Sequence, residues 1–177
     1  ASFVFPTYDR FQSSAFIRNG DYQKKEFKTI FGYLRSNGLL KTNSSFIDIG
    51  ANVGVHTVYA LQEPEIAKAI AIEPLQSNLF FLNTNLTING IEQKVQISET
   101  ALGDINGEIN LYLNPVNCGD NRLKPRQFEE ANLYHEHKFE AKRVPICTLD
   151  KLLETSSLDL ERFGFIWMDV QGAEGLI

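Results

Sequence analysis

Three acidic residues stand at the ends of short apolar runs, where a carboxylate can do chemistry. The stretch FIDIGANVGVHT (46–57) carries Asp48 two residues before a glycine turn, and two later apolar runs reach Glu73 and Asp169. Each run has the length and composition of a buried strand. Because ligands of an open parallel sheet bind outside the carboxyl ends of its strands, we expect these carboxylates to share one site.

The glycine spacing distinguishes two kinds of nucleotide ligand. Dinucleotide sites carry G-x-G-x-x-G, in which the second glycine lets the backbone touch a pyrophosphate. Here the matching positions hold Gly50, Asn52 and Val55, so a pyrophosphate would meet the side chain of Asn52. The spacing actually present, D-x-G-x-x-x-G ending at Gly54, still forms a tight turn with exposed amides. It favours a ligand without a diphosphate.

The carboxylates favour a nucleoside that carries positive charge. Glu73 can accept two hydrogen bonds from a ribose diol, and Asp48 repels phosphate but suits an ammonium group. S-adenosylmethionine, with its adenosine, sulfonium and amino-acid tail, meets these conditions. The alternative is an ordinary strand–helix turn, in which Asp48 caps the turn and Glu73 favours the N-terminus of the next helix.

Alternating strands and helices would place these residues. The pattern predicts a helix over 22–37, a strand over 46–49, a helix that ends before Pro64, a strand over 69–73, a helix that ends at 89–90, and strands over 94–98 and 164–170. Strands separated by helices predict an α/β fold with a mainly parallel sheet and helices on both faces.

The region 107–147 follows a different pattern. GEINLYL (107–113) alternates like a half-exposed strand, and RVPIC (143–147) is its expected antiparallel partner. Pro145 predicts a position at a sheet edge, and Thr148 is expected to cap a short helix over LDKLLE. The 115–141 segment between them is a long polar loop, which is typically functional or mobile.

That loop and the first crossover contain other candidates. His135 and His137 form an H-x-H, which we interpret as solvated rather than metal-binding, so no metal site is expected. Phe128, Tyr134 and Phe139 could form an acceptor lid or a satellite core. His56, one turn into the first crossover helix, is expected to be a packing residue rather than a base.

The bulk composition excludes several classes of protein. The 177 residues suit one domain of an ordinary soluble protein, with 43% hydrophobic and 22% charged residues and no apolar run of bilayer length. The net charge of -5 without a basic cluster predicts no nucleic-acid partner. Two cysteines, Cys118 and Cys147, are too few for a disulfide framework, so a reducing, cytoplasmic setting is expected.

The ordered set FIDIGANVGVHT, AIAIEP, SNLFFLNTNLTING, ALGD, TLDKLL and MDVQGAE resembles the FkbM family of S-adenosylmethionine-dependent methyltransferases. The resemblance spans residues 46 to 177. It implies the class I methyltransferase (Rossmann-like) fold and methyl transfer to a hydroxyl oxygen of a small molecule or sugar. Residues 1–44 would form an N-terminal helical cap and residues 45–177 the methyltransferase domain. The ending directly after a strand and glycine turn predicts a truncated domain without its later strands.

By this resemblance Asp48, Gly50, Asn52 and Gly54 belong to the cofactor loop, and Glu73 binds the ribose. Asp169 and Glu174 fall in the family's D-V-E-G-A-E motif, at the methyl-transfer edge, where Gln171 stands in place of the usual Glu.

An alcohol acceptor must lose a proton, and Asp169 is the first candidate base, with Glu174 second. The alternative is that Asp169 only orients the cofactor or caps the next helix. Two other functions stay open: a nucleotide-dependent oxidoreductase of the NAD type, and a cofactor-binding module without turnover. The sequence names neither the acceptor nor an oligomeric state.

Overall fold

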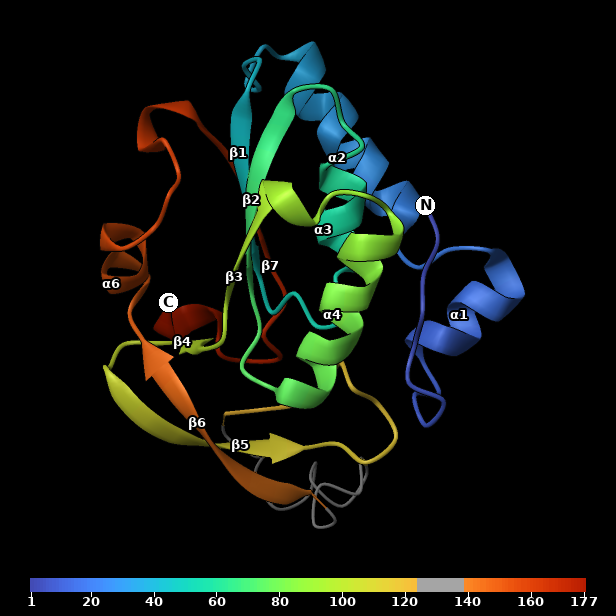
Figure 1. Cartoon of the computed structure of the whole chain (residues 1–177), viewed down its shortest axis with the longest axis vertical. Coiled ribbons are helices and arrows are strands. Elements are labelled where there is room, and N and C mark those ends of the chain that lie inside the picture. Colours follow the sequence, from blue (N-terminus) through green and yellow to red (C-terminus); the bar gives the residue numbers. More distant parts are fainter. Residues whose placement is uncertain (124–138) are drawn as a thin grey trace.

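A parallel four-stranded sheet forms the centre of the protein in a computed structural model that describes residues 1–123 and 139–177 (Figure 1). Its strands stand in the order β3-β2-β1-β7, and every neighbouring pair is parallel. They are β1 (Ser44–Ile49), β2 (Ile66–Ile72), β3 (Val95–Ser98) and β7 (Phe163–Met168). The first strand therefore lies inside the sheet and the chain winds outward from it on both sides.

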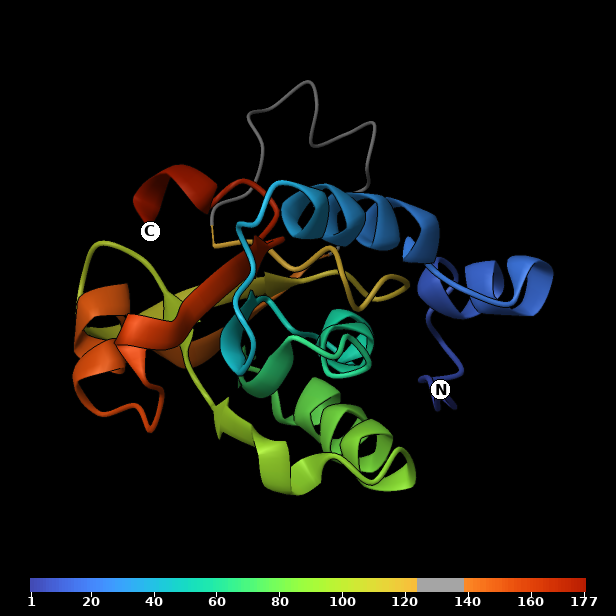
Figure 2. The same cartoon turned by 90° about the horizontal axis from the view of Figure 1, so that it is seen from above.

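Helices cover both faces of the sheet, as the sequence predicts (Figures 1 and 2). On one face lie α2 (Lys24–Ser36), α3 (Val55–Ala60) and α4 (Gln76–Ile88), and on the other lies α6 (Leu149–Glu154). Strand alternation divides the core between them: Phe46 packs with Phe27 and Phe31 of α2, whereas Ile47 packs with Leu152 of α6.

The predicted antiparallel pair forms a second, smaller sheet. β5 (Gly107–Leu113) pairs antiparallel with β6 (Glu140–Cys147), whose far side pairs with the two-residue β4 (Ala101–Leu102). The expectation that Pro145 marks an edge strand is wrong, because β6 is the central strand of this sheet. Proline is tolerated because β4 pairs only with Ile146 and Cys147, so residue 145 lies beyond its ladder.

Short helices complete the connections. α6 begins at the predicted cap, where the Thr148 side chain accepts from the backbone N–H of Lys151 at 3.2 Å. Within the described residues, single turns of 3-10 helix lie at Glu92–Lys94, Leu160–Arg162 and Glu174–Leu176.

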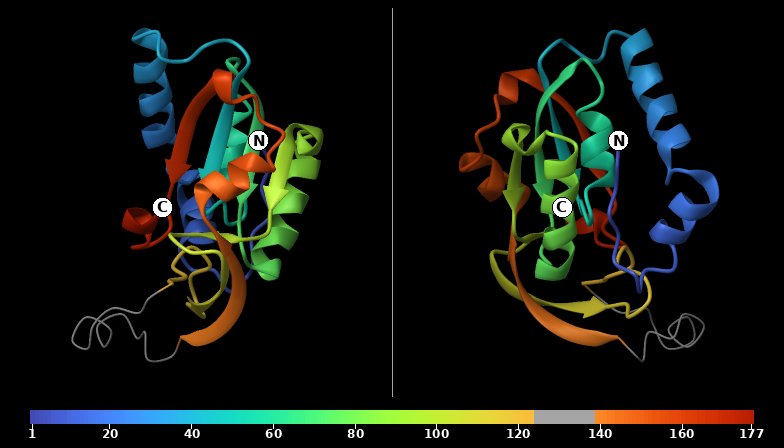
Figure 3. Two further views of the ribbon diagram at one scale, coloured as in Figure 1. Left: turned by 90° about the vertical axis from the view of Figure 1, so that its left-hand side faces the viewer. Right: turned by 45° about the vertical axis from the view of Figure 1, so that its right-hand side comes forward.

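The N-terminal segment packs beside α3 and α4, on the face of the sheet that these helices cover (Figure 3). It contains a helix that the sequence did not predict, α1 (Gln12–Asn19), and aromatic side chains that stack on the sheet's helices. The rings of Phe3 and Phe16 lie 4.9 Å apart, and Phe3 also meets Tyr59 of α3 edge-on. The division into a cap over 1–44 and a domain over 45–177 stays a prediction. The two termini lie on opposite sides of the sheet (Figure 2).

No helix in the described ranges is long and apolar enough to span a membrane. The candidate residues Phe128, Tyr134, His135 and His137 lie outside the described residues.

Candidate functional site

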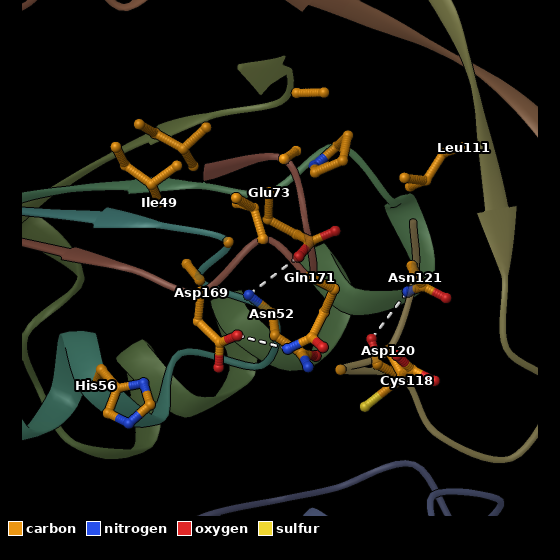
Figure 4. Close-up of a pocket in the computed structure, with 18 of the residues that line it drawn as sticks. Ile49, Asn52, His56, Glu73, Leu111, Cys118, Asp120, Asn121, Asp169 and Gln171 are labelled. Carbon is orange, nitrogen blue, oxygen red and sulfur yellow. Dashed lines mark hydrogen bonds between the residues drawn. The ribbon is translucent and has the colours of Figure 1, made fainter. Parts of the chain in front are cut away.

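A cavity of about 280 Å³ lies at the carboxyl ends of the parallel strands (Figure 4). Its floor comes from the turns after β1, β2 and β7, which supply Asn52, Glu73 and Asp169, and from Thr100 after β3. The small sheet contributes Leu111 to one wall. Glu73 and Asp169, two of the three carboxylates expected to share one site, line this cavity, whereas Asp48 does not.

The glycine turn after β1 is tight because its backbone contacts the ends of both neighbouring strands, β2 and β7. The backbone N–H groups of Gly50 and Ala51 both donate to the carbonyl of Ile72, at 3.1 and 2.9 Å, which ties the turn to the end of β2. Gly50 has φ of 83°, and a Cβ placed there would overlap the carbonyl oxygen of Asp169. Only glycine permits both this backbone conformation and the close approach of the β7 end.

Glu73 is a buried carboxylate that the turn holds in place. Its side chain is 5% exposed, and its two oxygens accept from the backbone N–H groups of Asn52 at 3.0 Å and Leu75 at 2.9 Å. The Asn78 side chain also donates to it, and because an ionised carboxylate has about four lone-pair sites, acceptor capacity remains for a ligand beyond these three donors. Burial raises the pKa of Glu73 to about 7, because the charged form loses solvation.

Asp169 lies across the cavity from Glu73, at the end of β7. Its backbone N–H donates to the carbonyl of Ile49 at 3.0 Å, and one carboxylate oxygen accepts from Nε2 of Gln171 at 2.5 Å (Figure 4). Burial raises the pKa of Asp169 above its ordinary value. The departure from the family motif at position 171 thus supplies an amide donor, where a glutamate would place a second carboxylate.

Three of the sequence-predicted residues are not among those that line the cavity: Asp48, Gly54 and Glu174. Glu174 is exposed and accepts from the N–H of Gly172 at 2.9 Å. At Gly54 an added Cβ would stand 2.5 Å from Leu82, so this glycine permits α3 to pack against α4.

Asp48 is fully buried behind the turn, on the face of β1 that packs against α2 and α3. One of its carboxylate oxygens accepts from the Thr57 hydroxyl at 2.5 Å, which links the strand to α3. Burial raises the pKa of Asp48 to about 7. The position therefore favours a role in holding the turn, rather than contact with an ammonium group.

His56 is packed, as expected, and it also lines the cavity. Its ring lies 4.5 Å from Trp167 and 5.7 Å from Phe27, and burial lowers its pKa to about 4. A neutral imidazole between aromatic rings is a weak base, so the packing role is the better interpretation.

The second wall of the cavity is the part that the sequence pattern missed. Gln12 and Tyr22 come from the N-terminal segment, and Cys118 and Gly119 come from the loop after β5. The Cys118 thiol donates to a carboxylate oxygen of Asp9 at 2.8 Å, and thus joins two segments far apart in the chain. No periodicity marks either segment, and only the unusual Cys118 within a polar loop could have drawn attention to it.

The winding of the sheet and the position of the cavity define a class of protein. A parallel sheet ordered 3-2-1-4 along the chain, with a glycine turn after the first strand and an acid at the end of the second, is a Rossmann-like arrangement. The model of the methyltransferase FkbM domain matches residues 48–177, so the chain belongs to this family and its sheet is that of a class I methyltransferase.

Known proteins overlap with this chain in part. The methyltransferase sdnD of Sordaria araneosa is 30% identical over 97 residues, which are 55% of this chain and 37% of that protein. The chain thus matches little more than a third of the length of this curated relative. The structure of an FkbM methyltransferase from Methylobacillus flagellatus is 18% identical, with a TM-score of 0.47. The matched region is 80% of this chain and 30% of that protein's chain. A candidate O-methyltransferase from Klebsiella pneumoniae, 20% identical with a TM-score of 0.37, covers 54% and 43%.

The residues present fit S-adenosylmethionine. The cavity offers a buried carboxylate to a ribose diol, and its described lining residues include no lysine or arginine that would pair with a diphosphate. Arg122 lies beside the cavity and pairs with Asp120 at 2.5 Å. Among the residues that the structure covers, no group of three or more His, Cys, Asp or Glu side chains could hold a metal ion.

Proposed function

We propose that this protein transfers a methyl group from S-adenosylmethionine to a hydroxyl oxygen of a small molecule or saccharide. The observation that carries the proposal is the Glu73 carboxylate, fixed by two backbone amides beside the glycine turn and facing a cavity with no described cationic side chain in its lining. Membership of the FkbM family supports methyl transfer as the reaction.

The residues of the chain would bind and orient both reactants. Glu73 would accept hydrogen bonds from the ribose diol, and the turn at Gly50 to Asn52 would lie against the cofactor's remaining part. When bound, S-adenosylmethionine supplies a methyl group on a sulfonium, whose positive charge disappears as the methyl leaves. Little new charge needs stabilisation, so alignment of the two reactants is the main contribution, worth up to ~7–11 kcal/mol in ideal geometry.

Asp169 would accept the proton of the acceptor hydroxyl. It lies at the rim of the same cavity, and Gln171 fixes one of its oxygens, which leaves the other for the hydroxyl. Burial raises its pKa, and a carboxylate with a raised pKa is a stronger base near neutral pH. Glu174 is the weaker candidate, because it is exposed and holds its own turn.

No nucleic-acid or membrane partner belongs to this proposal, since the net charge is negative and the cavity suits a small ligand. A cytoplasmic, reducing setting is part of it, because Cys118 and Cys147 are free thiols. Asn52 at the position where a dinucleotide site needs a close-approach glycine counts against the NAD-dependent alternative.

Calorimetric titration tests the proposal. S-adenosylhomocysteine and NAD are titrated separately into the protein and into its Glu73→Ala variant. Micromolar binding of S-adenosylhomocysteine alone, lost in the variant, is the expected result and would justify a screen of acceptor alcohols. Binding of NAD alone would overturn the proposal. Cofactor binding without transfer to any acceptor would instead favour a module without turnover.

A further inference from the structure

Gln12 is a buried amide at the start of an otherwise accessible helix. Its side chain is 8% exposed and lines the cavity, although residues 1–47 lie outside the part of the chain that matches the FkbM domain. Its position is fixed from behind: the backbone N–H groups of Phe11 and Gln12 donate to one oxygen of Asp9, at 2.6 and 3.0 Å. The other oxygen of Asp9 accepts from the Cys118 thiol.

The amide of Gln12 converges with that of Asn52 on a glycine. A Cβ placed on Gly119 would stand 2.9 Å from Nε2 of Gln12 and 3.1 Å from Nδ2 of Asn52. Asn52 is also 8% exposed, and it holds the left-handed backbone conformation, with φ of 51°. Two buried amides, one from the start of α1 and one from the turn after β1, therefore face the same small space.

These amides are incompletely satisfied. Oε1 of Gln12 and Oδ1 of Asn52 are buried and have no hydrogen-bond partner among the residues that the structure describes. A buried polar atom without a partner costs stability, so such atoms in a cavity indicate a ligand that supplies the missing hydrogen bonds.

The chemistry of the pair selects a zwitterion. Each amide presents both an acceptor oxygen and a donor nitrogen, so together they can accept from an ammonium group and donate to a carboxylate. Neither carries charge, which suits a group that is itself neutral overall. The carboxylates of Glu73 and Asp169 in the same cavity disfavour a ligand with net negative charge there.

We propose that Gln12 and Asn52, with Gly119 between them, bind the α-amino-acid end of S-adenosylmethionine. The inference rests on the proposed function and adds to it a ligand contact from the N-terminal segment. Cys118 and Asp9 act as positioning residues, because they hold the start of α1 against the loop that carries Gly119.

The test compares two ligands that differ only at this end. S-adenosylhomocysteine carries the amino-acid tail, and 5′-methylthioadenosine has the same adenosine and a thioether but no amino acid. Both are titrated calorimetrically into the protein and into Gln12→Met, which keeps the side-chain length but removes the amide. Exposed Gln93 is the matched control, as Gln93→Met.

Gln12→Met is expected to weaken S-adenosylhomocysteine by about tenfold or more and to leave 5′-methylthioadenosine within about twofold. Gly119 does not have a positive φ, so alanine fits its backbone conformation. Gly119→Ala fills the space between the two amides and is expected to show the same selective loss of S-adenosylhomocysteine binding. Binding of the tailless ligand also reports that each variant is folded.

Equal weakening of both ligands, or no change in either, would overturn the inference and leave the proposed function standing. Failure of the unmodified protein to bind either ligand would overturn the proposed function, and the inference with it.

Discussion

The affinity for S-adenosylhomocysteine should rise with pH between 6 and 8, because Glu73 must be ionised to accept both ribose hydroxyls. Burial raises the pKa of this carboxyl group to about 7 in the free protein. A group with that pKa is about one tenth ionised at pH 6 and about nine tenths ionised at pH 8. If only the ionised form binds, the dissociation constant should fall about tenfold over this interval.

Calorimetry measures both the affinity and the proton that is released. Titrations at pH 6, 7 and 8 give the dissociation constants, and repetition at pH 7 in two buffers of different ionisation enthalpy counts the protons. Roughly half a proton should leave per bound ligand at pH 7. Glu73→Gln should bind more weakly and lose the pH dependence.

Asp48 is the necessary comparison, since burial raises its pKa to about 7 as well. It is not among the cavity-lining residues, so Asp48→Asn should keep the pH dependence of binding. Equal affinity at pH 6 and 8 in the unmodified protein, or a slope that survives in Glu73→Gln, would refute the reasoning.

Three further results are expected. The pKa of Asp48 is about 7 in the folded protein and near its ordinary value in the unfolded chain. Between about pH 4 and pH 7 the folded protein therefore keeps a proton that the unfolded chain has lost. The free energy of unfolding should fall over this interval, by ~4 kcal/mol at most. Urea unfolding of Asp48→Asn at pH 5 and 8 should show a smaller fall. Gly50→Ala should destabilise the protein and abolish cofactor binding, whereas Gly38→Ala, also at positive φ but with open space around it, should cost only ~1–2 kcal/mol in thermal unfolding. Asp169→Asn should slow methyl transfer by ~10²–10⁴-fold with less effect on cofactor affinity, while Glu174→Gln should leave the rate nearly unchanged.

The sequence predicts the sheet well, because its strands are local apolar runs with glycine or proline at their ends. The alternation of 107–113 predicts a half-exposed strand, and its expected pairing with 143–147 is present within the longer strand β6. The two-residue alternation of side chains along β1 could also have predicted the position of Asp48. It shares a strand face with Phe46, which packs on α2, and this parity places it behind the turn.

The second wall of the cavity could not be predicted from sequence patterns. Gln12 and Gly119 lie in segments without hydrophobic periodicity, and their meeting depends on a hydrogen bond between Asp9 and Cys118, more than a hundred residues apart. A contact of this kind leaves no local pattern in either segment. Asn52 is different: its place in the glycine turn predicts that its side chain faces a ligand, and it lines the cavity.

The position of β7 beside β1 has a consequence for how the protein is made. Strands β1, β2 and β3 leave the ribosome in the order in which they pair outward, but β7 joins the opposite side of β1 after a separation of more than a hundred residues. The end of β7 supplies Asp169, whose carbonyl closes on Gly50. The cavity is therefore incomplete in a nascent chain until β7 has docked. Ligand binding would then stabilise forms in which β7 is paired with β1 and shift the population away from less assembled forms.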